Sequence, residues 1–258
     1  MADREAVKRA VPAVTRAVAI LRYLGRQDQP VGVNPMARDL GLVPSTCLHI
    51  LRVLTDEGLV RFDTVSKRYA LDVGLLSIAR TVIQRNAFIP MVQPHLDDLA
   101  ERFGATVLAT QVNDARQMVV VALNQVQQPL RLQVDLGSRF PALISATGRL
   151  YAAFSGTDPA SLREGFARLH WDVPPRFDAW LDQVAESRAR GYAVDRGAYM
   201  SGVTVIAVPF LDASGQMIRS LVSIGISERM EAAGIARQAD AMLRVRDRIE
   251  DASLAETP

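Results

Sequence analysis

Residues 34–71 contain two short segments with helical periodicity, a glycine between them, and a hairpin pattern directly behind. In the first segment Met36 and Leu40 lie one helical turn apart, and Asn34 is the expected N-cap. Gly41 follows, and glycine is the residue that most readily takes the left-handed conformation in which many helices end. This stretch constrains the fold more than any other, because it defines two helices and the turn between them within a short span.

The second helical segment begins at Pro44, where the missing proline N–H costs no hydrogen bond, and ends at the turn Asp56-Glu57-Gly58. Its spacing predicts one buried side and one exposed side. The buried side comprises Leu48, Leu51, Val53 and Leu54. The exposed side comprises Ser45, Thr46, His49 and Arg52.

A two-stranded hairpin is predicted for residues 60–71, since Val60 and Phe62 alternate with polar neighbours and residues 67–71 alternate again. The turn between the strands, residues 63–66, is polar. The cations of this hairpin are Arg61, Lys67 and Arg68. Two helices and a basic hairpin in this order predict a winged helix–turn–helix, which places one helix in a groove of DNA. The alternative is an ordinary helix pair of an α-rich domain, which leaves the basic hairpin unexplained.

The charge distribution fits a nucleic-acid partner for the first third of the chain. Residues 1–86 contain 13 Lys and Arg against 8 Asp and Glu, a net charge of +5, whereas the remainder contains 17 against 20, a net of −3. A basic domain is attracted to the phosphate backbone and an acidic one is not. Because the excess is small, we expect a dimer or a higher assembly to supply further cations. The alternative is ordinary variation in surface charge.

Composition favours a reducing compartment. The single cysteine, Cys47, cannot form an internal disulfide and is expected to be a buried apolar residue. No apolar run approaches the ~20 residues of a membrane-spanning helix. The first residues are charged rather than signal-like. We therefore expect a cytoplasmic protein without a membrane partner.

The periodicity predicts a DNA-binding domain over residues 1–71, a linker helix over 72–86 and a second domain over 87–258. We expect the linker helix to pack in part against its copy in a partner subunit. Further helices are predicted at residues 13–24, 90–103, 146–155, 159–169, 175–190 and 228–254. Strands are predicted at residues 105–112, 117–123, 130–134, 192–195, 203–209 and 219–226. Strands on both sides of a helical middle favour an antiparallel sheet with helices packed on it, an α+β architecture.

Three sequence blocks follow one another along the chain. The first combines Gly41-Leu42, Pro44-Ser45-Thr46-Cys47 and Gly58-Leu59-Val60. The second joins Gly137-Ser138-Arg139-Phe140-Pro141 to Ser145-Ala146-Thr147-Gly148-Arg149, and the third joins Arg190-Gly191-Tyr192-Ala193-Val194-Asp195 to Ile206-Ala207-Val208-Pro209. In this order and spacing, over nearly the whole chain, they resemble the IclR-type bacterial transcriptional regulators.

The resemblance implies a winged helix–turn–helix, a linker helix and a C-terminal GAF-like α/β effector domain with an antiparallel sheet. It also implies a homodimer or a dimer of dimers that binds a palindromic operator in double-stranded DNA and controls a catabolic operon in response to a small organic acid. It implies no cofactor and no metal. Many family members have an arginine where this chain has His49, so the operator sequence is expected to be its own.

The resemblance also places an effector pocket in the C-terminal domain. The backbone N–H groups of Ala146 and Thr147, at the start of a helix, would bind a carboxylate, since helix N-termini favour anions. The other positions carried over are the polar residues Asp195 and Ser223 and the apolar walls Leu132 and Phe140. Val205 and Gly225 replace a cysteine and a serine that other members have. Because both changes remove a polar group, we expect an effector larger and more apolar than a short keto acid, with an aromatic carboxylate favoured.

Two alternatives belong to other function classes. An enzyme would need a catalytic constellation, but the histidines show no metal-type spacing and no phosphate-binding glycine loop or nucleophile elbow occurs. A constitutive DNA-binding dimer without an effector would use Thr147, Asp195 and Ser223 only to complete the ends of strands and helices. We therefore expect a non-enzymatic regulator, and the constitutive dimer remains the alternative.

Overall fold

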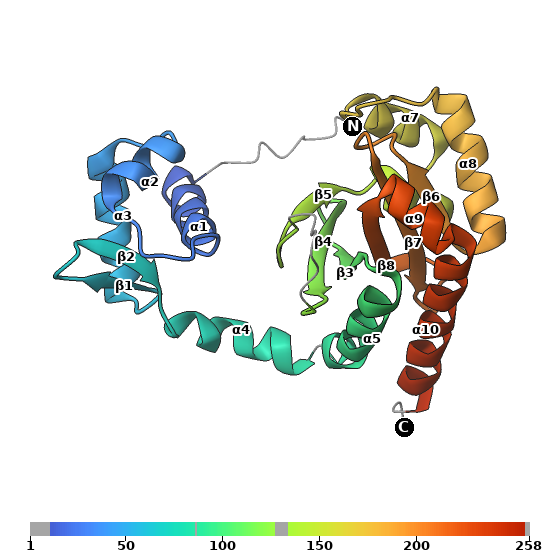
Figure 1. The fold of residues 1–258 in the computed structure, drawn as a ribbon. Coiled ribbons are helices and arrows are strands. Elements are labelled where there is room, and N and C mark those ends of the chain that lie inside the picture. The colour runs from blue at the N-terminus through green and yellow to red at the C-terminus, as the bar shows by residue number, and fades with distance from the viewer. Residues whose placement is uncertain (1–10, 86, 127–133, 256–258) are drawn as a thin grey trace, which may run out of the picture. The chain divides into compact units, whose positions relative to one another are not determined.

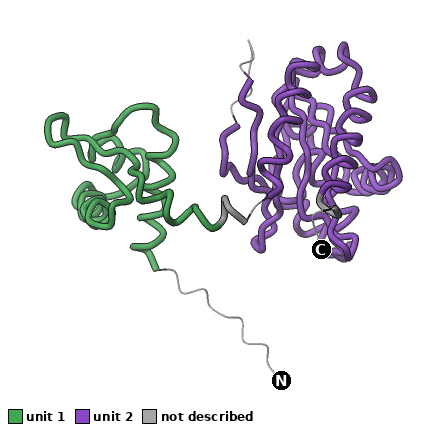
Figure 2. Tube along the Cα trace, turned by 90° about the horizontal axis from the view of Figure 1, so that it is seen from below, with its two compact units in different colours: residues 1–86 green, residues 87–258 purple. Residues whose placement is uncertain are grey.

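A computed structural model of the protein describes residues 11–85, 87–126 and 134–255 (Figure 1). The chain forms two compact units, residues 1–86 and residues 87–258 (Figure 2). Among the described residues no helix is long and apolar enough to cross a membrane. Each unit has a hydrophobic core of its own.

Three helices build the core of unit 1: α1 (Pro12–Leu24), α2 (Val33–Asp39) and α3 (Pro44–Asp56). Ile20, Met36 and Leu51, one from each helix, are completely buried in one apolar cluster. Cys47 lies in the same cluster and is a free thiol, which confirms the prediction for this residue. Close packing among all three helices therefore fixes the helix–turn–helix.

The predicted hairpin follows α3 as β1 (Val60–Asp63) and β2 (Arg68–Leu71). Its residues Val60 and Tyr69 are buried in the helical core. Tyr69 also exchanges backbone hydrogen bonds of 2.8 and 2.9 Å with Val31, in the loop between α1 and α2. The hairpin is thus fastened to the helices both by apolar packing and by its backbone.

Two local predictions in this unit are wrong. α2 begins at Val33, so Asn34 lies inside the helix instead of capping it. The backbone is extended at Val31, which pairs with the hairpin, and at Gly32, which is the actual N-cap. Val53, predicted to be buried, is 59% exposed. The buried side of α3 contains Leu51, and a residue two positions further along the helix points ~200° away from it. Helix α4 (Gly74–Arg85), the predicted linker, ends the unit.

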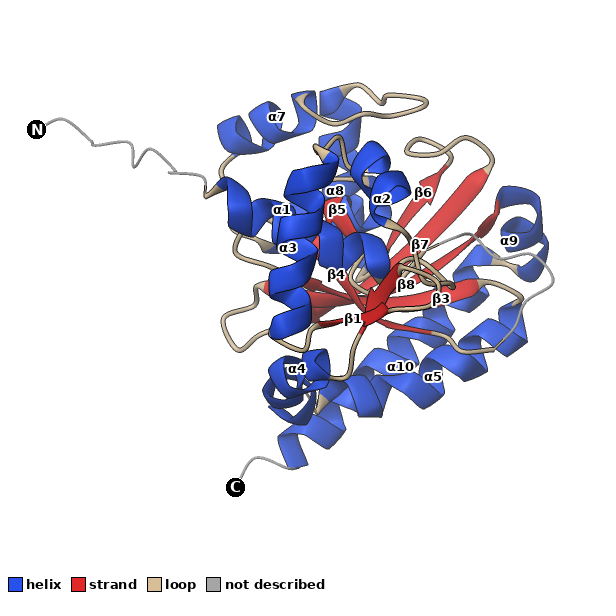
Figure 3. Ribbon diagram, turned by 90° about the vertical axis from the view of Figure 1, so that its left-hand side faces the viewer, coloured by secondary structure: helices blue, strands red, loops and turns tan. Residues whose placement is uncertain are grey.

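An antiparallel sheet of six strands lies in unit 2, counted over its described residues, in the order β5-β4-β3-β8-β7-β6 (Figure 3). The strands are β3 (Thr106–Val112), β4 (Gln117–Leu123), β5 (Arg139–Pro141), β6 (Ala193–Arg196), β7 (Val203–Leu211) and β8 (Met217–Ile226). The antiparallel sheet confirms the predicted architecture. Strand β5 is an addition that the periodicity does not predict. The strand predicted over residues 130–134 falls outside the described residues except for its last position, which is not in a strand.

Helices cover both faces of this sheet. α5 (Phe88–Phe103) and α10 (Ile235–Ala255) lie side by side on one face (Figures 1 and 3). α6 (Ser145–Phe154) packs on the other face, over β6, β7 and β8. α7 (Pro159–Ala167) and α8 (Phe177–Arg190) join α6 through a separate aromatic cluster. The central strands are therefore buried from both sides.

The helix predicted over residues 228–254 is interrupted. It consists of α9 (Ser227–Ala233) and α10, with Gly234 between them at a φ of +83°. Glycine adopts this backbone conformation readily and other residues do not. The break allows Met230 of α9 to be buried in the same core that α10 covers.

Gly148 in α6 is required for reasons of space. A Cβ atom added there would lie 2.0 Å from the backbone carbonyl of Leu143, whereas a Cβ at Gly165 in α7 would meet only the Cδ1 end of the same Leu143 at 2.7 Å. We expect Gly148→Ala to lower the free energy of unfolding by about 3 kcal/mol, because packed backbone cannot move aside. Gly165→Ala should change it by less than about 1 kcal/mol, since a side-chain end can move and alanine favours the helix. Urea denaturation of both variants measures this, and equal losses would contradict it.

Candidate DNA-binding surface and effector site

The predicted DNA-contacting residues of α3 share one side of the helix. Ser45, His49 and Arg52 are exposed and follow one another at intervals of four and three residues, about one turn each. Thr46 is half-buried at the edge of this side. The opposite side carries the fully buried Leu51. The helix therefore presents a polar ridge to solvent, which is the form a recognition helix requires.

The hairpin adds three exposed cations beside this ridge: Arg61, Lys67 and Arg68. Neither these three nor Arg52 forms an ion pair with any described residue. The ammonium of Lys67 lies 5.9 Å from the ring centroid of Phe62. Exposed cations without carboxylate partners are available to phosphate oxygens.

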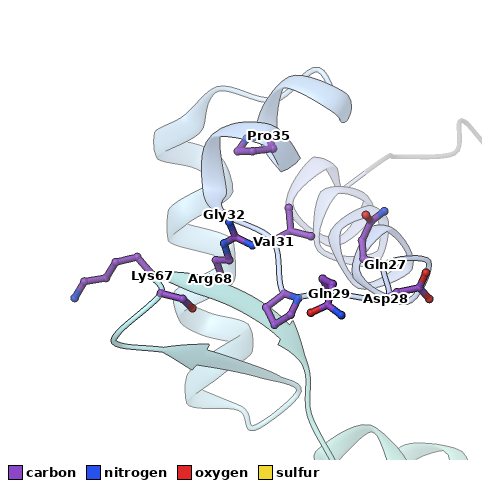
Figure 4. Close-up of a pocket in the computed structure, with 10 residues that line it drawn as sticks. Gln27, Asp28, Gln29, Val31, Gly32, Pro35, Lys67 and Arg68 are labelled. Atoms are coloured by element: carbon purple, nitrogen blue, oxygen red, sulfur yellow. The ribbon is translucent and has the colours of Figure 1, made fainter.

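Arg68 and Lys67 point in different directions. Figure 4 shows Arg68 directed toward Gly32, across a pocket of about 550 Å³ between the α1–α2 loop and the hairpin, whereas Lys67 points away from it. Asp63 shapes the hairpin turn, because its Oδ1 accepts hydrogen bonds of 2.8 and 3.3 Å from the N–H groups of Val65 and the following residue. These bonds hold the pKa of Asp63 below its usual range. The turn conformation thus sets where the two cations project.

Five predicted effector residues lie on the α6-facing side of the sheet in unit 2, although Phe140 is on the edge strand β5 and Asp195 on the opposite edge strand β6. The five are Phe140, Ala146, Thr147, Asp195 and Val205. Phe140, Ala146 and Val205 belong to one apolar cluster. Asp195 lies directly opposite Val205 in the pairing of β6 with β7. Thr147 follows Ala146 in the first turn of α6. Leu132, the other predicted wall, lies outside the described residues.

The start of α6 holds polar atoms that the fold does not use. The first N–H groups of a helix have no acceptor within it. Ser145 has a φ of +58°, and its hydroxyl is buried without a hydrogen-bond partner among the described residues. Thr147 instead donates its hydroxyl to the carbonyl of Ile144 at 3.0 Å. Backbone N–H groups and the Ser145 hydroxyl are therefore the polar groups that a ligand oxygen could meet here.

Ser223 and Gly225 lie on the other face of the sheet. The Ser223 hydroxyl donates to Oε1 of Gln238 in α10 at 3.4 Å, and the side of Gly225 that lacks a side chain faces α9. The neighbours of Ser223 in β8, Val222 and Ile224, belong to the apolar cluster on the α6-facing side. Successive residues of a strand point to opposite faces. The positions predicted to face the effector, Ser223 and Gly225, are therefore each one residue away from the positions of β8 that face α6.

Asp195 is already engaged within the fold. Its oxygens accept the N–H groups of Ala198 and Tyr199 at 3.0 and 3.2 Å, and Oδ2 lies 3.9 Å from Nη1 of Arg149. The two side chains are 1% and 4% exposed, and the Arg149 Nε donates to Gln183 at 2.8 Å. Burial lowers the pKa of Arg149, while Asp195 opposes this shift. Asp195 therefore closes a loop and neutralises a buried guanidinium.

Removal of the Asp195 carboxylate would leave Arg149 as an uncompensated buried charge. We expect Asp195→Asn to lower the free energy of unfolding by about 3–5 kcal/mol. Asp172→Asn is the matched control, since Asp172 also accepts a loop N–H, from Ser201 at 2.8 Å, but is exposed; it should cost about 1 kcal/mol. Chemical denaturation measures both. The double variant Asp195→Asn with Arg149→Met should regain stability, and no recovery would contradict this account.

Fold and surface together define a DNA-binding protein of the winged helix–turn–helix class with a second, α/β domain. Residues 13–64 match the IclR helix-turn-helix domain, and residues 80–250 match the family described as bacterial transcriptional regulator IclR, C-terminal. The chain belongs to the IclR family of bacterial transcriptional regulators. It is thus a member of a family of regulators, not of enzymes, as the sequence predicts.

Individual relatives agree with this assignment. The chain is 29% identical over 228 residues to the glycerol operon regulatory protein of Streptomyces coelicolor, which covers 86% of this chain and 87% of that protein. It is 24% identical over 251 residues to the HTH-type transcriptional repressor AllR of Escherichia coli, covering 96% and 91%. The solved structure of an IclR regulator from Alicyclobacillus acidocaldarius matches with a TM-score of 0.76 at 22% identity, over 93% of this chain and 98% of that one.

A further solved structure is an IclR homolog from Microbacterium hydrocarbonoxydans, complexed with 4-hydroxybenzoate. It matches with a TM-score of 0.71 at 16% identity, over 93% of this chain and 98% of that one. At these identities the solved structures support the fold. The family and fold predicted from the sequence are therefore confirmed.

Proposed function

We propose that this DNA-binding regulator controls a catabolic operon by binding a palindromic operator as a homodimer or a dimer of dimers. In this proposal, a small aromatic carboxylate binds to a GAF-like C-terminal domain and changes the affinity for the operator. The observation that carries the proposal is the polar ridge of α3 beside exposed cations that lack ion-pair partners. Ser45, Thr46 and His49 are assigned to base edges. Arg52 and the hairpin cations Arg61, Lys67 and Arg68 are assigned mainly to phosphates.

Assembly into a dimer is supported by apolar side chains that unit 1 leaves uncovered. Val14 on α1 is 61% exposed, and Leu76 and Ile78 on α4 are each 64% exposed. A second copy packed on these helices would cover them. Two recognition helices in one dimer would then read half-sites about one DNA turn, ~34 Å, apart.

The phosphate assignment of Arg52 predicts a change in salt dependence. Arg52→Gln should weaken binding to the protein's own promoter DNA about tenfold and reduce the slope of log K against log salt by about 1, because one phosphate contact is lost. Fluorescence anisotropy over a range of salt concentrations measures both quantities. Arg229→Gln, which removes an exposed cation of α9, is the control for net charge. An equal effect of both variants would refute the assignment.

The effector proposal rests on the chemistry of the α6-facing side of the sheet. Polar groups at the start of α6 suit a carboxylate, and Val205, Val222 and Ile224 line that side with apolar atoms. Such a site favours an effector whose carboxylate is attached to an apolar ring over one that carries a second polar group. That one IclR homolog has been solved with 4-hydroxybenzoate is in keeping with this ligand class.

Ligand class can be tested by stability and by calorimetry. We expect 4-hydroxybenzoate at about 100 times its Kd to stabilise the full chain by about 2.7 kcal/mol, since a ligand that binds the folded state raises apparent stability. Glyoxylate and pyruvate should have no comparable effect. Val205→Ser, which adds a hydroxyl to the apolar wall, should weaken benzoate binding. Binding of the keto acids but not of benzoates would overturn the ligand class. If no acid stabilises the chain, the constitutive DNA-binding dimer is the correct reading.

A further inference from the structure

A groove of about 590 Å³ lies at one end of the sheet in unit 2, between the start of α5, the β7–β8 hairpin and the later turns of α10. Pockets of ~300–1,000 Å³ are the size that holds small organic ligands. Its apolar walls come from Phe88, Pro209, Phe210, Leu211, Ile218 and Ile249. Phe88 and Phe210 belong to the core on the α5 and α10 side, so the groove is separate from the α6-facing effector site.

Arg219 of β8 lines this groove and is stacked on an aromatic ring. It pairs across the sheet with Phe210, so both side chains share a face. Its guanidinium carbon lies 4.7 Å from the ring centroid of Phe88, which meets the Phe210 ring edge-on at 5.1 Å. Its Nε donates to Oε1 of Gln111 at 3.3 Å. These neighbours orient the guanidinium, but none of them carries a negative charge.

The other charged groups of the groove already have partners. Asp212 accepts two backbone N–H groups of the β7–β8 turn, at 2.8 and 3.0 Å. Arg246 is bonded to Asp247 at 2.6 Å, and Glu250 lies 3.8 Å from the Arg246 Nε. Arg219 is therefore the one cation of this groove without an ion pair among the described residues. Burial also lowers its pKa, which reflects the cost of holding this charge away from water.

A half-buried guanidinium beside an apolar wall selects for one ligand chemistry. A carboxylate can bond to the guanidinium fork with two hydrogen bonds, and an apolar body can displace water from the aromatic wall. An uncharged ligand would leave the Arg219 guanidinium unpaired, and an inorganic anion would leave the apolar wall of the groove in contact with water. We propose that this groove is a second ligand site, which binds an amphipathic monocarboxylate with an alkyl or aryl body.

The groove also contacts the start of α5. Phe88 is the first residue of α5, and unit 1 ends two residues earlier at Asn86. A carboxylate held by Arg219 would cover the ring of Phe88 and restrain the first turn of α5. The second site thus includes the first residue of α5.

Octanoate is a suitable probe. The control ligand is 1-octanol, which has an alkyl chain of similar length but no charge. Isothermal titration of the full chain should show octanoate binding that Arg219→Gln weakens by about tenfold or more, because a charge-assisted pair is lost. Arg219→Lys keeps the charge without the fork and should fall between them. Octanol should bind weakly to all three proteins.

A second variant leaves the cation in place. Ala213 lines the groove on an exposed turn, so Ala213→Trp should fill the groove and abolish octanoate binding without disturbing the core. Arg229→Gln is again the control for net charge and should bind octanoate normally. Binding of 4-hydroxybenzoate and of operator DNA should be unchanged in these variants, which separates this proposal from the proposed effector site.

The proposal is overturned if octanoate does not bind, or if it binds equally well to Arg219→Gln and Ala213→Trp. It is also overturned if sedimentation shows that both variants, without ligand, dissociate an assembly that the unaltered chain forms. That result would assign the groove to a contact between copies of the chain.

Discussion

The buried pair of Arg149 and Asp195 joins the elements of unit 2 on which the proposed effector site depends. Arg149 comes from α6 and also donates to Gln183 of α8, while Asp195 lies in β6, next to its last residue, and accepts hydrogen bonds from the loop that follows. Both charges are removed from water, so each is stable only while the other is present. The placement of α6 on the sheet, and with it the cluster of polar groups at its first turn, depends on this pair. Substitution of Asp195 would therefore change the fold before it reported on a ligand.

Burial of the central strands from both faces explains how one sheet can serve two sites. In β7, Val205 and Ala207 point to α6, while Ile206 and Val208 point to α5 and α10. In β8 the side chains alternate in the same way, so that Val222 faces the proposed effector site and Arg219 faces the proposed second site on the other face of the sheet. A ligand on either face would contact strands whose other side packs on helices, so each site is coupled to the core through the same backbone.

Much of the DNA-binding unit follows from local sequence. Met36, Leu40 and Gly41 define a helix and its end, and the alternation around Tyr69 defines the hairpin, because each pattern is read within one element. The two errors arose where a distant contact intervened. Val31 pairs with the hairpin and shifts the start of α2 away from the Asn34 cap. Val53 became exposed because packing of Leu51 fixes the rotation of α3.

The sequence by itself determined the class of fold, the polar side of α3, the basic hairpin and the presence of strands that alternate, since these depend on spacing along one segment. Only the tertiary structure decided which face Ser223 and Gly225 occupy, because strand register is set by the neighbours β3 and β7 and a shift of one residue reverses every side chain. It also decided that Asp195 is occupied by Arg149 while Arg219 has no carboxylate partner among the described residues. Pairing of charges depends on which distant side chains the fold brings within a few ångströms, and spacing along the chain does not contain that information.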